Sequence, residues 1–241
     1  MCARITSIPC FAIICWSSSL LLPDMRSRHL IFIVRRRPWV SIRTLHLGRS
    51  GLRVSSFCLG TLTFGEDWPF GSSVTVSEAV LARFLERGGN FLDTANMYAY
   101  GHSEKIIGDY VARSRLRRDG LVIATEFAGN LYGHVRDPNG RGTSRKTILQ
   151  ACEQSLRRLR TDYIDLYWMH VWDALTPIDE TMGTLESLVQ TGKVRYIGIS
   201  DAPAWKVSQA QMIALSRGWT PLIALRIEYS LLERTTESEY I

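Results

Sequence analysis

Short apolar runs and stretches with helical hydrophobic spacing alternate along the chain from residue 44 to its end. Each apolar run predicts a strand, and the amphipathic stretch that follows it predicts a helix. The predicted strands are residues 54–59, 90–93, 121–125, 163–169, 194–199 and 222–227. The predicted helices are residues 77–87, 103–112, 145–160, 176–190 and 203–216, with a last helix beginning near Thr235.

Two of these helices carry predicted start signals. Ser77 is the expected N-cap of the first, because a serine side chain there can accept a hydrogen bond from the first helical turn. Thr176 is the expected cap of the fourth helix, with Pro177 at its first helical position. Gly192 is expected to end that fourth helix.

The predicted strands are continuous apolar runs rather than alternations of apolar and polar residues. Continuous runs are typical of strands buried on both faces, as in a parallel sheet covered by helices. No Gly-x-Gly-x-x-Gly motif follows the first strand, which disfavours an open dinucleotide-binding sheet. The expected fold class is therefore α/β, a TIM-type (β/α)8 barrel that is incomplete, with about six βα units.

Residues 1–43 lack this alternation. They hold apolar runs at residues 8–16 and 30–34, and neither approaches the roughly 18 residues of a membrane span. The segment resembles a secretory or organellar leader, but no A-x-A-like cleavage site is evident. In preference to a working signal, we expect an atypical basic and apolar extension over residues 1–43, poorly ordered and upstream of the real start. Residues 44–241 are expected to form a partial barrel domain.

The net charge of +6 is unevenly distributed. The first 50 residues carry +7, from eight arginines and one aspartate, and the remainder has 21 basic and 22 acidic side chains. Because the barrel region is close to neutral, the charge gives no reason to expect nucleic-acid binding. The five cysteines show no CxxC pair and no regular spacing. A disulfide framework or zinc site is therefore not expected, and a reducing, cytoplasmic compartment is.

Polar residues stand at or just beyond the ends of five predicted strands. They are Asp93, Glu126, His170, Ser200, Asp201 and Arg226. In α/β barrels the active site lies at the carboxyl ends of the strands, so we expect these side chains to converge on one rim. Asp93 is followed five residues later by Tyr98, and this pair suits a proton-transfer site. A buried capping acid and a packed tyrosine are the structural alternative.

A metal site is a second interpretation of the same rim. Asp93, Glu126 and His170 offer three ligands of the kind found at catalytic metal sites. None of the three belongs to a tight ligand motif, and a metal site would leave Tyr98 without a role. Proton transfer without a metal is therefore the preferred interpretation.

Several motifs, in the right order, resemble the aldo/keto reductases, which are NADPH-dependent barrel enzymes. They are residues 48–55 (GRSGLRVS), 59–65 (LGTLTFG), 88–108, 155–170 (SLRRLRTDYIDLYWMH), 192–201 (GKVRYIGISD) and 228–234 (EYSLLER). The chain is particularly similar to the bacterial branch related to aryl-alcohol dehydrogenases and potassium-channel β subunits. The resemblance implies NADPH as cofactor and a small-molecule carbonyl substrate. It also implies hydride transfer to the carbonyl carbon while a tyrosine protonates the oxygen.

The resemblance implies a catalytic Asp, Tyr, Lys and His. These match Asp93, Tyr98, Glu126 and His170, so that Glu126 stands where the family has lysine. The pKa of a free tyrosine is near 10; an adjacent ammonium lowers it, whereas an adjacent carboxylate raises it. We therefore expect a poor reductase, and we expect Glu126→Lys to improve carbonyl reduction.

The resemblance also implies a set of cofactor-binding residues. They are Gly60, Thr61, Leu62, Asp93, Ser200, Asp201 and Arg226. Arg226 departs from the family's glutamine, and an arginine donates hydrogen bonds but cannot accept them. The family's last two βα units, which hold the cofactor phosphates, would follow residue 241. Without them we expect weak NADPH binding and self-association through open edges at the first and sixth strands.

Two other interpretations stay open at this point. One is a non-catalytic family member that senses nucleotide or binds a partner, and the other is a degenerate fragment. The substrate is not specified, because loops determine it in this family. Phe64, Trp68 and Trp172 are candidates for an apolar substrate pocket, with ordinary packing as the alternative.

Overall fold

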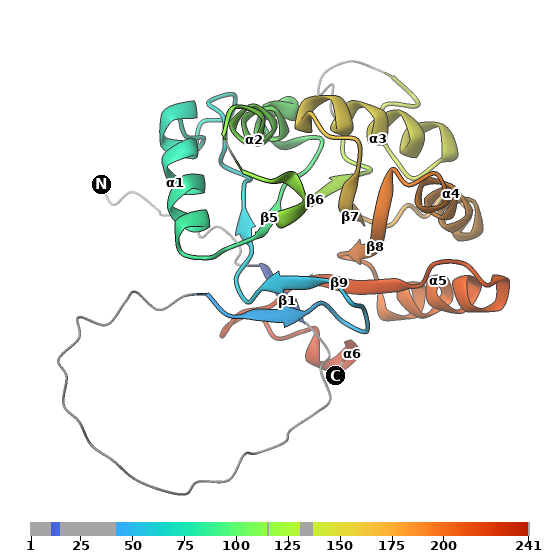
Figure 1. Ribbon diagram of the computed structural model, residues 1–241. Coiled ribbons are helices and arrows are strands. Elements are labelled where there is room, and N and C mark those ends of the chain that lie inside the picture. The colour runs from blue at the N-terminus through green and yellow to red at the C-terminus, as the bar shows by residue number, and fades with distance from the viewer. Residues whose placement is uncertain (1–10, 15–41, 115, 131–136, 241) are drawn as a thin grey trace, which may run out of the picture.

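Six parallel strands form a curved sheet in the computed structural model, which describes residues 11–14, 42–114, 116–130 and 137–240 (Figure 1). The strands, in their order across the sheet, are β4 (Leu59–Gly60), β5 (Phe91–Asp93), β6 (Val122–Phe127), β7 (Ile164–Met169), β8 (Val194–Ser200) and β9 (Leu222–Glu228). Each of them pairs in parallel with its neighbour along the chain. The predicted α/β class, an incomplete (β/α)8 barrel with six βα steps, is confirmed.

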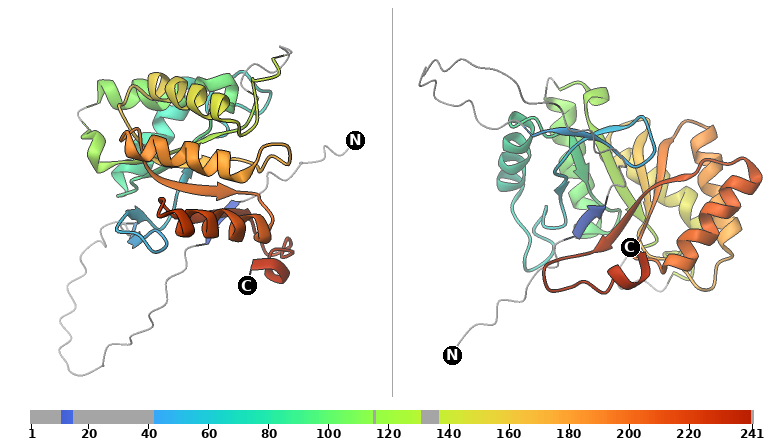
Figure 2. Two further views of the ribbon diagram at one scale, coloured as in Figure 1. Left: turned by 90° about the vertical axis from the view of Figure 1, so that its right-hand side faces the viewer. Right: turned by 90° about the horizontal axis from the view of Figure 1, so that it is seen from below.

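A helix follows each of these strands. The helices are α1 (Val74–Glu86), α2 (His102–Arg113), α3 (Arg145–Leu159), α4 (Ile178–Gln190), α5 (Ala204–Arg217) and the short α6 (Glu237–Tyr240). Helices α1 to α5 lie along the outer side of the curved sheet, and α3, α4 and α5 lie side by side (Figures 1 and 2). Two 3-10 helices complete the set, η1 (Tyr98–Gly101) and η2 (Arg118–Gly120).

The strands are mostly apolar because both faces of the sheet are covered. Every residue of β6 and β7 is buried. Leu166 and Trp168 pack on the inner side of the sheet, in a cluster that contains no helical residue. Tyr167 and Met169 pack on the outer side, in a cluster shared with α3, α4 and α5. Since successive residues of a strand point to opposite faces, both sets must be apolar.

The first predicted strand, residues 54–59, is wrong in its extent. Its beginning belongs to β3 (Arg53–Ser55), which pairs with β2 (Thr44–His46) in a separate antiparallel hairpin. The barrel strand β4 begins only at Leu59. The hairpin is fixed by Asn90, whose Oδ1 accepts a hydrogen bond of 2.6 Å from the Ser55 backbone N–H. Leu47 and Val54 of the hairpin region pack on Phe91, so the hairpin covers the amino end of the sheet.

The predicted start of the first helix is also wrong. Helix α1 begins at Val74, and its N-cap is Ser73, whose side chain accepts a hydrogen bond from the Val76 backbone. Ser77 lies inside the helix, where its hydroxyl is buried against that of Ser72, 3.0 Å away. Both valines of the first turn are exposed, so the apolar spacing did not mark this end. Helix α4 likewise begins after Pro177, which itself occupies the N-cap position.

The sixth barrel strand is not an open edge. Residues 11–14 form β1 (Phe11–Ile14), which pairs antiparallel with β9, from Phe11 opposite Glu228 to Ile14 opposite Leu225 (Figure 2). The rest of the predicted poorly ordered extension, residues 1–43, lies almost wholly outside the described residues. At the other edge, β4 pairs with β5 alone. Within the described ranges, no helix combines the length and apolar character needed to cross a membrane.

Candidate active site

The parallel register brings the predicted polar residues to one edge of the sheet. Asp93 ends β5, Glu126 lies near the end of β6, His170 follows β7, and Ser200 ends β8. In β9, Arg226 pairs in register with Ser200. The carboxyl ends of the strands therefore hold acid, base and hydroxyl groups together, as expected for an α/β barrel site.

Arg226 lies at the centre of this cluster. Its Nη1 donates to Asp93 Oδ2 at 2.7 Å and also to Glu126 Oε1, and its Nε donates to Ser200 Oγ at 3.2 Å. The side chains are almost fully buried, with Arg226 3% exposed and Glu126 not exposed at all. One guanidinium thus occupies the space between two buried carboxylates. The sequence placed Arg226 on the rim and among the cofactor contacts, but it did not predict that Arg226 lies between the two acids.

Burial and Arg226 act in opposite directions on Asp93. Burial raises the pKa of the Asp93 carboxyl, whereas the charge and hydrogen bond of Arg226 lower it. Burial also disfavours the charged form of Arg226, but Asp93 and Tyr98 outweigh this, and its pKa is raised. The guanidinium therefore stays charged, and it offsets much of the desolvation that two buried carboxylates would otherwise suffer.

Tyr98 reaches the cluster from η1, directly after β5. Its side chain is 7% exposed. The next two residues, Ala99 and Tyr100, have φ of 46° and 54°, a left-handed conformation that is uncommon for side-chain-bearing residues. Burial and the charge of Asp93 raise the pKa of Tyr98 to about 12, while Arg226 opposes this by its charge and by a hydrogen bond to the phenol.

Two rings flank Tyr98. His170 lies edge-on to it, with the ring centroids 6.1 Å apart, and the ring of Trp68 lies 6.4 Å away. Trp68 was one of three predicted candidates for an apolar pocket, and it is the one in contact with the tyrosine. Phe64 belongs instead to the core beneath α1 and α2, and Trp172 packs edge-on against Trp205.

His170 is held in its neutral form by burial. Its Nδ1 lies 2.8 Å from Glu126 Oε2, without the alignment of a hydrogen bond. Burial lowers the pKa of His170, and the charges of Asp93 and Asp201 only partly oppose this. A neutral imidazole can both donate and accept a hydrogen bond.

The lowered pKa of His170 predicts a pH dependence of stability. An unfolded chain protonates this histidine below about pH 6.5, whereas the folded chain does not until a lower pH is reached. The contribution of His170 to the free energy of unfolding should therefore be full above about pH 6.5. It should fall as the pH drops below that value, by at most about 1.4 kcal/mol per pH unit. Urea unfolding between pH 7.5 and 5.5 measures this, and His170→Gln should flatten the slope. His46→Gln, at an exposed histidine, is the control; equal slopes in all three proteins would contradict the prediction.

The predicted cofactor-binding residues lie beside Asp93. Thr61 is buried, and both its backbone N–H and its hydroxyl donate to the Asp93 carbonyl oxygen at 2.9 Å. Gly60 is exposed at the end of β4, and a methyl group added there would meet no atom within 4 Å. Asp201 has a φ of 43° and its N–H donates to the Arg226 carbonyl oxygen. Leu62 is half-buried next to Thr61.

Trp168 is a site residue that the sequence analysis missed. It is fully buried on the inner side of the sheet, and it lies close enough to Asp93 to lower the pKa of that carboxyl slightly. The signal was present in the strand period, because Trp168 lies two residues before His170 and so shares its face of the sheet. A tryptophan N–H has only donor character, which fits it to a carboxylate partner.

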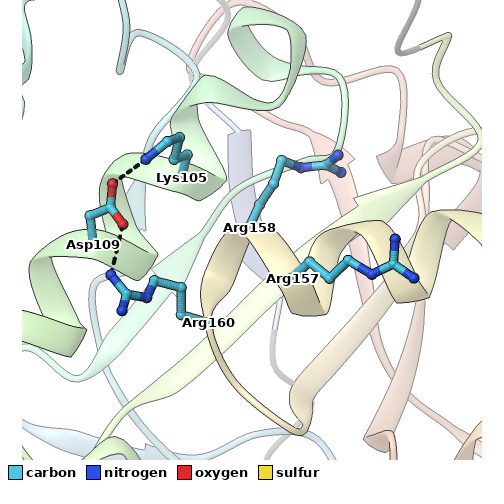
Figure 3. Close-up of a pocket in the computed structure, with 5 residues that line it drawn as sticks. All are labelled: Lys105, Asp109, Arg157, Arg158 and Arg160. Carbon is cyan, nitrogen blue, oxygen red and sulfur yellow. Dashed lines mark hydrogen bonds and ion pairs between the residues drawn. The ribbon is translucent and has the colours of Figure 1, made fainter.

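A pocket lies away from the strand ends. It has a volume of about 400 Å³ between α2 and α3, and its lining residues are Lys105, Asp109, Arg157, Arg158 and Arg160 (Figure 3). Three of its cations are already paired. Lys105 and Arg160 both contact Asp109, and Arg158 contacts Glu104. The predicted site residues do not line it.

A parallel sheet with helices outside, and with Asp93, Tyr98, His170 and Arg226 meeting at the carboxyl edge, is the arrangement of an α/β-barrel enzyme. The sequence profile described as "Aldo/keto reductase family" matches residues 56–241. The chain belongs to the aldo/keto reductase family.

Curated relatives agree with this assignment. An aryl-alcohol dehydrogenase of Pestalotiopsis microspora is 40% identical over 80% of the chain and 51% of its own length. Norsolorinic acid reductase B of Aspergillus parasiticus is 39% identical over 80% of the chain and 52% of its own length. The aryl-alcohol dehydrogenase [NADP(+)] of Phanerodontia chrysosporium is 38% identical over 79% and 52%. The chain thus spans about half the length of these relatives.

Proposed function

We propose that the chain is an NADP-dependent oxidoreductase that interconverts aldehydes or ketones and alcohols, with Tyr98 as the proton donor in reduction. The observation that carries the proposal is the position of Tyr98. Its phenol is buried at the strand ends, edge-on to His170 and near the charge of Arg226. A general acid needs a proton, a fixed position and protection from bulk water, and these contacts supply all three.

In this proposal the residues of the rim divide the work. Tyr98 gives its proton to the carbonyl oxygen and regains one from solvent after the alcohol leaves. Neutral His170 donates a hydrogen bond to the same oxygen and orients it. Asp93 holds Arg226, and Trp168 forms part of the inner wall of the site. Trp68 provides an apolar ring beside the tyrosine, which favours an aromatic substrate.

A nicotinamide ring is proposed to lie at the rim, beside Gly60. The space beside Gly60 is open, and the half-buried Leu62 and the hydroxyl of Ser200 border the same strand ends. Gly60, Thr61, Leu62, Ser200 and Asp201 are the residues proposed to hold the ring. When bound, the nicotinamide supplies the hydride for the carbonyl carbon. NADP is proposed because the name of one relative, from Phanerodontia chrysosporium, includes it.

Two measurements test the proposal in sequence. Quenching of tryptophan fluorescence during titration with NADPH tests binding, with NADH as the comparison. Loss of NADPH absorbance on addition of an aryl aldehyde then tests turnover, because two of the relatives named above are aryl-alcohol dehydrogenases. Saturable binding of NADPH followed by aldehyde-dependent oxidation is the expected result. No binding of either nucleotide to the folded chain would contradict the proposal.

A second candidate is a non-catalytic family member that binds nucleotide. The observation in its favour is the second carboxylate of the rim, Glu126, because negative charge near Tyr98 disfavours the phenolate that reduction must produce. NADPH binding without turnover of any aldehyde would favour this candidate.

We also propose a cytoplasmic location, supported by Cys58 and Cys152, which are free thiols.

A further inference from the structure

We propose that Arg226 is the positioning cation of the Tyr98 site, and that Glu126 is present to hold Arg226. In this arrangement the positive charge that faces the tyrosine comes from β9, while β6 supplies a carboxylate that anchors it. The inference rests on the proposed function, and it changes the meaning of Glu126. Rather than a defect in the site, Glu126 is one half of a mutually dependent pair.

The geometry shows why the pair is mutually dependent. Asp93 Oδ2 and Glu126 Oε1 both contact one nitrogen, Nη1 of Arg226. Removal of the guanidinium would leave two carboxylates facing each other in a buried space, where one of them must take up a proton. Removal of Glu126 would leave Arg226 in contact with Asp93 and Ser200.

The charge of Arg226 near Tyr98 links the Arg226–Glu126 pair to the proposed reaction. When Tyr98 gives up its proton, a phenolate forms near Asp93, and Arg226, whose Nη1 is held on Asp93, is the cation whose charge offsets it. The guanidinium can do this while bound to the carboxylates, because its five N–H groups point in fixed, separate directions. Glu126 limits this support, because it neutralises part of the charge, but it also fixes where the guanidinium lies.

This arrangement reverses the sequence-based expectation for Glu126→Lys. A lysine at this position would place an ammonium against Arg226 Nη1, where the structure has a carboxylate. Two cations in contact in a buried site repel each other, as two anions would. We therefore expect Glu126→Lys alone to impair the protein, and we expect it to be tolerated only when Arg226 is replaced as well.

The experiment compares the wild type with Glu126→Lys, Arg226→Gln and the double variant. Each single variant is expected to lose about 100-fold in kcat/KM for aldehyde reduction and at least about 6 °C in Tm without nucleotide. The double variant, which moves the cation from β9 to β6, is expected to recover about tenfold over either single variant, and to recover Tm. Arg226→Lys, the conservative variant, should keep the pH profile of alcohol oxidation, whereas Arg226→Gln should shift its alkaline limb to higher pH.

Two results would overturn the inference. One is a double variant no more stable than its worse single parent, and the other is an Arg226→Gln protein with the wild-type rate and pH profile. If neither single variant folds, recovery of a folded double variant supports the pair. Failure of all three variants to fold contradicts it. An inactive wild type would refute the proposed function alone. The contact with Tyr98 is then decided by Tm, because Arg226→Gln must cost less stability in a Tyr98→Phe background.

Discussion

Replacement of Tyr98 by phenylalanine is expected to lower aldehyde reduction by about 10²–10⁴-fold, the usual contribution of a positioned general acid. The phenyl ring keeps the packing against Trp68 and His170, and only the hydroxyl is lost. The free energy of unfolding should therefore change by no more than about 0.5–1.5 kcal/mol. Steady-state kinetics and NADPH titration on the same preparation separate lost chemistry from lost binding.

The matched control is Tyr100→Phe. Tyr100 lies two residues away in η1, also packs edge-on near Trp68, but is 49% exposed. It should retain wild-type kinetics, because its hydroxyl lies outside the buried cluster. Equal rates in Tyr98→Phe and Tyr100→Phe would show that Tyr98 is not the proton donor.

The direction of the pKa of Tyr98 adds a pH test to the same experiment. With a pKa of about 12, the phenol keeps its proton throughout the neutral range. The rate of reduction should therefore show no alkaline loss from Tyr98 near neutral pH. Oxidation of an alcohol needs the phenolate as base, so its rate should rise with pH across the same range. This rise should disappear in Tyr98→Phe.

The sequence predicted which polar residues lie at the carboxyl edge of the sheet, because the rules that place them depend on short stretches of sequence. The six strands are apolar because both of their faces are buried, and a parallel sheet brings all their carboxyl ends to one edge. Asp93, Glu126 and His170 could therefore be placed together from the sequence alone. Trp168 could have been added by counting two residues back from His170 along the strand.

The features that could not be predicted depend on contacts between distant residues. Ser55 and Asn90 decide where the hairpin ends and β4 begins, and 35 positions separate them. Arg226 and Asp93 are 133 positions apart, and nothing in either motif shows that the two side chains meet. The sequence could therefore name Glu126 and Arg226 as two separate departures from the family, but not as partners.

Glu104 connects three elements of the structure behind the rim, namely α2, α3 and β6. It is fully buried in the first turn of α2. Its Oε1 accepts a hydrogen bond of 2.5 Å from the Thr125 hydroxyl on β6, and its Oε2 accepts one of 2.6 Å from Arg158 Nε on α3. Since Thr125 directly precedes Glu126, these bonds also fix the strand end that carries the anchor of Arg226.

Replacement of Glu104 by alanine is expected to be the most destabilising single change considered for the fold. Loss of one partner of a buried ion pair costs about 3–5 kcal/mol, because the other charge stays buried without compensation. Arg158 lines the pocket of about 400 Å³ between α2 and α3, so water can reach part of its guanidinium (Figure 3). We therefore expect a loss of about 3 kcal/mol, the lower end of this range. Urea unfolding at neutral pH measures it.

Lys105→Ala is the control on the adjacent residue of α2. Lys105 pairs with Asp109 at the surface, and such exposed pairs contribute no more than about 1 kcal/mol. A second variant separates the lost interaction from the stranded charge. In Glu104→Ala combined with Arg158→Met, no cation is left unpaired, so part of the stability should return. Equal unfolding midpoints for Glu104→Ala and Lys105→Ala would mean that the buried pair does not brace β6 against α2 and α3.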